Sequence, residues 1–241
     1  MFADPKGERM GLADDIRLLR NRALADLHAA HDYYGDTKLA WQILRKAILS
    51  GKIVNPAKKN TVTGTVTNLG TLVVKSRNYV AVQLAESTFQ QFISIFEAFF
   101  ADFMRLWLQA NPLSLGQKDI KFRDVLEAPD KDAITLSVVN KEINRVAYGS
   151  PKDWFEYLES RCQLGLPTEH DIQLFSEAKA SRDILVHNQG VVNAIYKEKA
   201  GDVRHYAIGD RIEIPDVYHR RTLELIRKMV TDISDTAITK A

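Results

Sequence analysis

The sequence has a single cysteine, Cys162, among 241 residues, which excludes an intramolecular disulfide and a cysteine-based metal cluster. One cysteine fits a reducing compartment, so we expect a cytoplasmic protein. Long hydrophobic runs are missing too, because the most apolar stretch, residues 89–108, is interrupted by Gln90, Gln91, Glu97, Asp102 and Arg105. Residues 1–11 contain no apolar core of a signal peptide. We therefore expect a soluble protein without a membrane span.

Acidic residues are missing from residues 37–85, although the whole chain is nearly neutral, with 33 Lys and Arg against 31 Asp and Glu. The acid-free stretch contains eight cations: Lys38, Arg45, Lys46, Lys52, Lys58, Lys59, Lys75 and Arg77. It carries +8 and leaves −6 on the rest of the chain. Three interpretations stay open: a solvated arm, a dock for an acidic partner protein, or an RNA-binding surface formed by Lys58, Lys59, Lys75 and Arg77.

Signatures of several common chemistries are also missing. The sequence has no glycine-rich phosphate loop, and Ser, His and Asp do not follow an order typical of hydrolases. His28, His31 and Asp32 have a spacing compatible with a metal ion on a helix, but the sequence places no third ligand beside them. We therefore expect neither a metal ion nor a cofactor.

Helical periodicity is what the sequence has in abundance, and it predicts a mainly α fold, an antiparallel helical bundle. Apolar residues at steps of three and four predict a first helix over residues 12–49, with a break near Gly35. Residues 55–78 are rich in Thr, Asn, Gly and Val, which favours a weak hairpin or a loop over a helix. We expect an N-terminal helical region at 1–50, a basic arm at 51–79 and a helical domain at 80–235, together forming one globular unit.

The strongest predicted helix spans residues 80–110 and carries a broad phenylalanine-rich face, which indicates the central core helix. Start signals predict further helices after Pro129, after Ser150 and after Thr168. The helix that begins after Thr168 should end near His187, where Asn188, Gln189 and Gly190 follow. Alternating apolar residues within 195–215 predict a small hairpin, and a last helix is expected over residues 216–233.

The segment at residues 177–190 places an arginine where a helical wheel expects an apolar residue. Arg182 lies on the same face as Leu174 and Leu185, and a guanidinium cannot lose its charge, so it needs a carboxylate or an anionic ligand there. Glu97, at the edge of the apolar face of the core helix, is the expected carboxylate. His187 lies about 140° further round the wheel, so a turn after the helix or a second copy of the chain is needed to bring both side chains to one target.

The surroundings of His187 predict an imidazole suited to proton transfer. Asp183 precedes it by one helical turn and is expected to orient it, and the carboxyl end of a helix favours the imidazolium. A second Arg and His pair with similar spacing, Arg22 and His28, lies in the middle of a helix, and Arg22 is followed by an alanine. The pair in 182–187 is therefore the better candidate.

Arg182 and His187 with four intervening residues, followed by Asn188 and Gly190, resemble the Arg-x4-6-His signature of HEPN domains. The passage R-D-I-L-V-H-N-Q-G-V-V and the earlier S-I-F-E-A-F-F are similar to a bacterial subgroup with RNase-toxin-like members. The resemblance covers residues 80–235. It implies an all-α homodimer that cleaves RNA without a metal ion, often paired with an antitoxin protein in toxin-antitoxin or phage-defence systems.

The resemblance also implies roles for individual residues. His187 would act as the base or acid and Arg182 would bind the scissile phosphate, with Asp183 orienting His187, Asn188 binding a phosphate oxygen and Glu97 supporting Arg182. Two alternatives stay open. One is an inactive HEPN-like module that binds RNA, a nucleotide or a partner protein through the same helix; the other is an enzyme that acts on a different phosphate substrate.

Overall fold

The computed structural model describes residues 11–53, 58–201 and 203–241, apart from the side chain of Lys58. Its helices are α1 (Leu12–Leu49), α2 (Leu69–Asn78), α3 (Ala85–Ala110), α4 (Phe122–Glu127), α5 (Lys131–Ala147), α6 (Pro151–Cys162), α7 (Glu169–His187), α8 (Ala194–Ala200) and α9 (Asp216–Lys240). A π-helical segment (Tyr79–Leu84) joins α2 to α3, and a short 3₁₀ helix (Pro112–Leu115) follows α3. The mainly α bundle is thus confirmed. Residues 1–10, where no signal peptide is expected, and residues 54–57 of the predicted arm lie outside the described residues.

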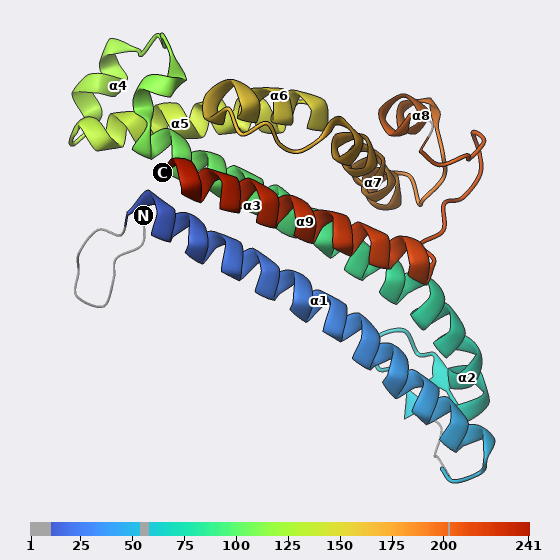
Figure 1. Cartoon of the computed structure of the whole chain (residues 1–241). Coiled ribbons are helices and arrows are strands. Elements are labelled where there is room, and N and C mark those ends of the chain that lie inside the picture. Colours follow the sequence, from blue (N-terminus) through green and yellow to red (C-terminus); the bar gives the residue numbers. More distant parts are fainter. Residues whose placement is uncertain (1–10, 54–57, 202) are drawn as a thin grey trace.

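Three long helices, α1, α3 and α9, form one side of the molecule (Figure 1). Ion pairs of Arg20 with Asp235 and of Lys38 with Asp216 join opposite ends of α1 and α9, so these two helices run antiparallel. The predicted break near Gly35 was wrong, because α1 is continuous over 38 residues. Gly35 is exposed and a side chain there would meet nothing within 4 Å, so its only cost is the weak helix propensity of glycine.

The arm between α1 and α3 is only partly as predicted. Its hairpin exists, as strands β1 (Lys58–Lys59) and β2 (Val66–Thr67) paired antiparallel. The expectation that residues 55–78 contain no helix is wrong, because α2 begins at Leu69 and runs through the π-helical segment into α3. Asn68 caps α2 by accepting a hydrogen bond from the backbone N–H of Thr71. The helical segment that contains α3 therefore begins before residue 80, at Leu69. Together with the C-terminal end of α1, its first turns project away from the rest of the molecule (Figure 1).

The second layer contains α5, α6, α7 and α8, with α4 at one end (Figure 1). The helix starts predicted after Ser150 and Thr168 are confirmed, and each is a capping box, Ser150 with Asp153 at α6 and Thr168 with Asp171 at α7. The second predicted hairpin, within 195–215, was wrong. Asn193 caps α8 instead, and Arg211 forms a single bridge with Val191.

The core is one cluster that extends from the start of α1 to the end of α9. Phe96 of α3 is fully buried and lies 4.6 Å, between ring centroids, from Phe175 of α7. Phe100 stacks on Trp154 of α6 at 5.5 Å. Both sides of the bundle thus pack on the phenylalanine-rich face of α3, as the sequence predicts. The last helix is longer than expected and ends at Lys240, with Ala237 fully buried. None of the described helices has the length and apolarity needed to cross a membrane.

A histidine is buried where α1, α3 and α9 meet. His219 is 1% exposed, stacks on Tyr34 at 4.1 Å between ring centroids, and shares a 2.7 Å hydrogen bond with the hydroxyl of Thr88. Burial, with smaller contributions from the nearby His31 and Lys38, lowers the pKa of His219 to about 4, and Asp216 partly opposes the shift. The folded protein therefore holds this imidazole neutral at pH values at which the unfolded chain protonates it.

Acidification from pH 7 to pH 5 is therefore expected to destabilise the protein through His219. Above pH 6.5, the pKa of the histidine in the unfolded chain, the residue is neutral in both states and does not change the unfolding free energy. Below pH 6.5 the unfolded chain binds a proton that the folded protein binds only near pH 4, so the unfolded state is favoured. The expected loss between pH 7 and pH 5 is about 2 kcal/mol of unfolding free energy. Urea unfolding at the two pH values measures it. His219→Gln should lose much less, and an equal loss in both proteins would contradict the assignment.

Candidate functional site at the end of helix α7

The sequence-predicted site lies on the last turns of α7 and on the loop that follows it. The backbone N–H of Gly190 donates to the carbonyl of Ile184, which closes the helix end. Gly190 has φ +76°, and a Cβ there would lie 3.3 Å from the Leu185 side chain. The left-handed conformation favours glycine, and a Cβ would also have to displace the Leu185 side chain slightly. Residues 190 and 192 then hydrogen-bond with the segment 209–212, which holds the loop in place.

Arg182 is held by two carboxylates. Its Nη2 pairs with Glu97 of α3, and its Nη1 donates to Asp183 at 3.0 Å. The Arg182 side chain is 19% exposed, and its buried Nε has no hydrogen-bond partner among the described residues. The predicted pairing with Glu97 is confirmed. The guanidinium thus has the countercharge that its position requires, and both carboxylates would compete with a phosphate for it.

Lys179 joins this group, and the sequence reasoning missed it. Its Nζ lies 3.2 Å from Glu97 and 3.5 Å from Asp183, with the side chain 16% exposed. The four side chains of Glu97, Lys179, Arg182 and Asp183 form a neutral ion cluster, two cations and two anions. The spacing of four between Lys179 and Asp183 is a helical ion-pair signal that could have identified the lysine.

His187 stands apart from this ion cluster. It is exposed at the last position of α7, and no hydrogen bond or ion pair joins its side chain to another described residue. Asp183, expected to orient His187, has its carboxylate paired with Arg182 and Lys179. Asn188, expected to bind phosphate, donates through its side-chain amide to the carbonyl of Val191 at 2.6 Å. The amide of Asn188 thus stabilises the turn, and the imidazole is free to meet a ligand.

The regular helix keeps Arg182 and His187 apart. Five residues on an α-helix correspond to a rise of about 7.5 Å and a rotation of about 140°. Because α7 is helical up to His187, the chain turns only after the histidine and does not direct its side chain toward Arg182. The two side chains of one chain therefore face different directions, Arg182 toward α3 and His187 toward solvent.

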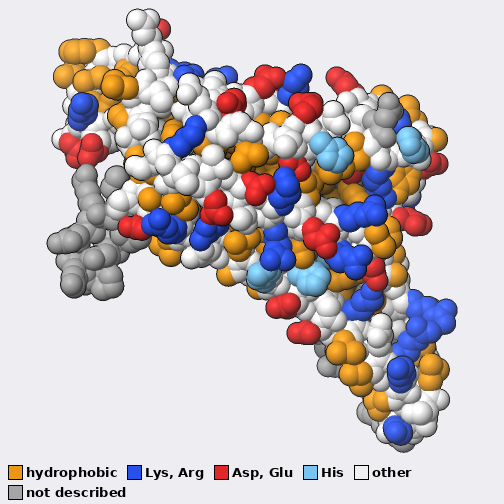
Figure 2. All heavy atoms as spheres, viewed as in Figure 1, with side chains coloured by type: hydrophobic (Ala, Val, Ile, Leu, Met, Phe, Trp, Pro, Cys, Tyr) orange, Lys and Arg blue, Asp and Glu red, His pale blue; other side chains and the backbone are white. Residues whose placement is uncertain are grey.

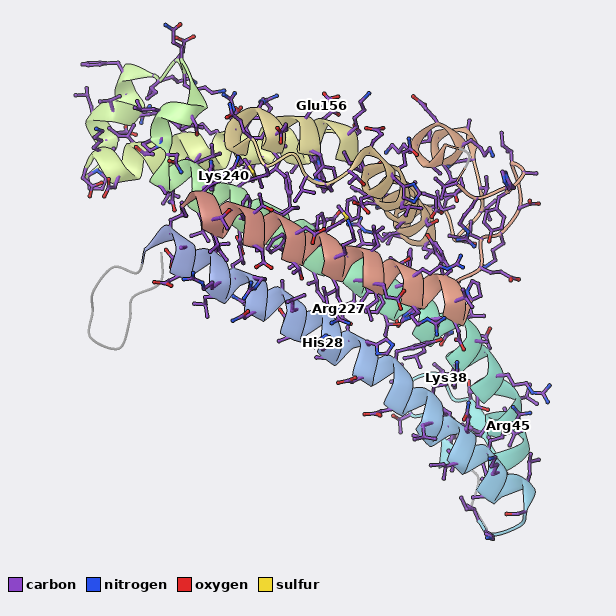
Figure 3. All side chains as sticks on the ribbon, viewed as in Figure 1. His28, Lys38, Arg45, Glu156, Arg227 and Lys240 are labelled. Atoms are coloured by element: carbon purple, nitrogen blue, oxygen red, sulfur yellow. The ribbon has the colours of Figure 1, made fainter. Side chains whose placement is uncertain are left out.

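The predicted RNA-binding cations lie far from α7, on the projecting arm. Lys59 of β1 and Arg77 of α2 are exposed, Lys75 is half-buried, and the side chain of Lys58 is outside the described residues. Lys and Arg side chains gather toward the free end of the arm, where acidic side chains are scarce (Figure 2). Lys38 and Arg45 lie on the α1 side of the same arm (Figure 3). The described part of the acid-free sequence thus forms a projection on which several cations lie as separate patches among apolar and uncharged groups (Figure 2).

The remaining candidate groups are the histidines of α1 and the single cysteine. Among the described residues no three His, Cys, Asp or Glu side chains are placed to hold a metal ion. His28 is exposed, whereas His31 has its ring 6.5 Å from that of His219. Burial raises the pKa of the Cys162 thiol to about 12, with Glu159 adding to the shift, so the thiol stays protonated and unreactive at neutral pH.

A second polar cluster, which the sequence reasoning missed, surrounds Glu177 on another face of α7. Glu177 is 1% exposed and accepts hydrogen bonds from Ser181 at 2.7 Å, from Tyr196 at 2.9 Å and from Tyr218 at 2.6 Å. Arg204 lies 3.9 Å from the same carboxylate and 4.0 Å from the ring centre of Tyr218. The Glu177 cluster, defined by these five residues, joins α7 to α8, α9 and the loop before α9.

Comparison of the chain with protein-family models, with curated proteins and with solved structures finds no match, so the HEPN resemblance stays a prediction drawn from Arg182, His187 and the residues around them.

Proposed function

We propose that this chain is a HEPN-like, metal-independent endoribonuclease that cleaves single-stranded RNA. The observation that supports this best is the end of α7, which presents an exposed histidine whose side chain has no partner among the described residues, five residues after an arginine held in place by carboxylates. An imidazole and a guanidinium are sufficient for RNA cleavage, because RNA contains its own nucleophile.

The proposed reaction is attack of the 2′-hydroxyl on the adjacent phosphorus. His187 removes the proton from that hydroxyl, and the new bond from O2′ to phosphorus forms as the bond to the 5′-oxygen breaks. The leaving oxygen takes a proton from a second acid, such as the His187 of another copy, and the products are a 2′,3′-cyclic phosphate and a 5′-hydroxyl. Arg182 stabilises the negative charge that develops on the phosphate oxygens.

The proposal includes a homodimer. Arg182 and His187 of one chain diverge by about 140°, so two copies of α7 packed around a common cleft would supply a histidine and an arginine to the same phosphate. The chain should accordingly be dimeric at micromolar concentration. Measurement of its mass in solution tests this, and a monomer would contradict the shared cleft. An antitoxin partner and a role in toxin-antitoxin or defence systems belong to the same proposal.

A second candidate function is a non-catalytic module that binds RNA or a partner protein. The observation that favours it is the ion cluster, in which Glu97 and Asp183 already neutralise Arg182. The two functions differ in one assay. Purified protein incubated with single-stranded RNA in EDTA should produce fragments with cyclic phosphate ends if the ribonuclease proposal holds. Binding of the same RNA without cleavage would favour the module.

The basic arm is expected to add affinity for RNA that depends on salt. Each phosphate contact on a single strand contributes about 0.7 to the slope of log affinity against log salt concentration. Removal of two exposed cations, in the double variant Lys59→Ala and Arg77→Ala, should therefore reduce the slope by about 1.4. Fluorescence anisotropy of a labelled single-stranded RNA across a salt series measures it.

The matched control removes two exposed cations from the body, Arg123 of α4 and Lys152 of α6, each of which pairs with a glutamate one turn away. Their replacement by alanine should leave the slope unchanged. Equal slopes for the arm variant, the body variant and the wild type would show that these cations do not bind RNA, which leaves the solvated arm and the dock for an acidic partner protein.

A further inference from the structure

We infer that a cavity between α3, α5 and α6 is a binding site for a small uncharged aromatic compound that carries a hydrogen-bond acceptor. The cavity has a volume of about 230 Å³. An apolar cavity of about 150 Å³ is enough to take up benzene, so this one has room for a substituted ring. The inference does not depend on the proposed ribonuclease activity.

The walls of the cavity are apolar and come from three helices. Phe100 and Met104 belong to α3, Ile143 and Val146 to α5, and Trp154 to α6. All five are buried, with at most 7% of the residue surface exposed. Phe100 and Trp154 already stack on each other, and the aromatic lining favours an occupant that is itself a planar ring.

Glu97 and Lys179 form the charged end of the cavity, and Tyr157 is the other polar residue in its lining. Lys179 has three N–H donors but two carboxylate partners, Glu97 at 3.2 Å and Asp183 at 3.5 Å, and its Nζ lies 5.5 Å from the centre of the Trp154 ring. The ammonium thus retains a donor for an acceptor atom on an occupant.

The charge balance at this end selects an uncharged occupant. Lys179 and Arg182 are neutralised by Glu97 and Asp183, so a further charged group would be removed from water without an opposite charge to compensate it. Exposed Ala147 and half-buried Ala101 also line the cavity and mark where it reaches the surface. An aromatic ketone, with its ring against Trp154 and its carbonyl oxygen toward Lys179, satisfies all of these conditions.

Acetophenone is a suitable probe, and isothermal titration calorimetry of the intact chain should give saturable binding with one molecule per chain. Ala101→Leu should fill the cavity and weaken the binding at least tenfold, whereas Ala29→Leu, at an exposed position on α1, should leave it unchanged. Ala147→Leu, at the rim of the cavity, should also weaken the binding at least tenfold. It replaces Ala101→Leu in the experiment if circular dichroism shows that Ala101→Leu does not fold.

A second measurement separates recognition of the acceptor from apolar uptake. Lys179→Met should weaken acetophenone at least fivefold without weakening propylbenzene, which has no acceptor. Absence of saturable acetophenone binding to the wild type would overturn the inference, as would equal binding to folded Ala101→Leu or Ala147→Leu variants. Equal affinity of wild type and Lys179→Met for acetophenone would overturn the assignment of Lys179 as the donor.

Discussion

Replacement of His187 by alanine is expected to reduce RNA cleavage by about 100-fold or more, because a positioned general base or acid contributes about 10²–10⁴-fold to a proton transfer. The residue is exposed and has no hydrogen bond to another described residue, so its removal should leave stability within about 0.5 kcal/mol of the wild type. A loss of activity in a fully folded variant would then result from the loss of the catalytic imidazole and not from unfolding. Initial cleavage rates in EDTA, with circular dichroism of both proteins, measure the two quantities.

The matched control for this variant is His170→Ala. His170 is also an exposed histidine of α7, but it lies in the first turn, about five turns from His187. Its removal should not change the cleavage rate. Equal rates for the wild type and both variants would remove His187 from the mechanism, and equal loss in both variants would indicate a general effect of surface charge.

Arg182 needs a different substitution, because truncation would leave Glu97 without its closest cation. Arg182→Lys keeps the charge in the ion cluster but loses the planar fork that binds two phosphate oxygens at once. Cleavage should therefore fall by about tenfold or more, which corresponds to about 1.4 kcal/mol of transition-state stabilisation. Unchanged cleavage by a folded Arg182→Lys protein would assign the arginine to structure alone.

Several helix starts and one ion pair of this fold could be predicted from local sequence patterns. The capping boxes at Ser150 and Thr168 fix two helix starts through hydrogen bonds within four residues, and the structure contains both. The pairing of Arg182 with Glu97 was also predictable, because both residues lie at the edges of apolar helix faces that have to meet in the core. A charge in such a position has few ways to be compensated.

Other features depend on partners that are distant in sequence, and local signals could not predict them. The Thr-, Asn-, Gly- and Val-rich composition of residues 55–78 favours a hairpin or a loop, yet α2 forms over Leu69–Asn78, where it packs beside α1 and continues through the π-helical segment into α3. The break expected at Gly35 is absent for the same reason: neighbouring turns of α1, including buried Tyr34, pack in the bundle. Tertiary packing outweighs a propensity difference of about 1 kcal/mol.

The Glu177 cluster is the clearest example of a feature that local sequence patterns could not predict. Its three hydroxyl donors come from α7, α8 and α9, at positions 181, 196 and 218, and the guanidinium of Arg204, in the loop before α9, lies 3.9 Å from the carboxylate. Burial and the nearby Glu177 carboxylate raise the pKa of both Tyr196 and Tyr218, so their hydroxyls stay protonated and donate to it. One buried carboxylate thus fixes the positions of α8 and the loop that cover this face of α7.

Replacement of Glu177 by alanine is therefore expected to cost about 3–5 kcal/mol of unfolding free energy. The variant leaves a nearby Arg204 without its carboxylate and three hydroxyls without their acceptor, and removal of one member of a buried charge pair has this magnitude. Glu177→Gln keeps one carbonyl oxygen as an acceptor and should lose less. Glu198→Ala, at an exposed glutamate of α8, is the matched control and should change stability by no more than about 0.5 kcal/mol.

Urea unfolding of the four proteins measures these differences, and hydrogen exchange shows where the loss is concentrated. Because the hydroxyls of Tyr196 and Tyr218 bind the same carboxylate, Glu177→Ala should speed amide exchange most in α8 and in residues 203–215. The packing of α1 on α3 does not involve Glu177, so exchange there should accelerate only as far as global unfolding does. A loss below about 1 kcal/mol, or uniform acceleration along the whole chain, would show that apolar packing rather than the buried carboxylate holds α8 in place.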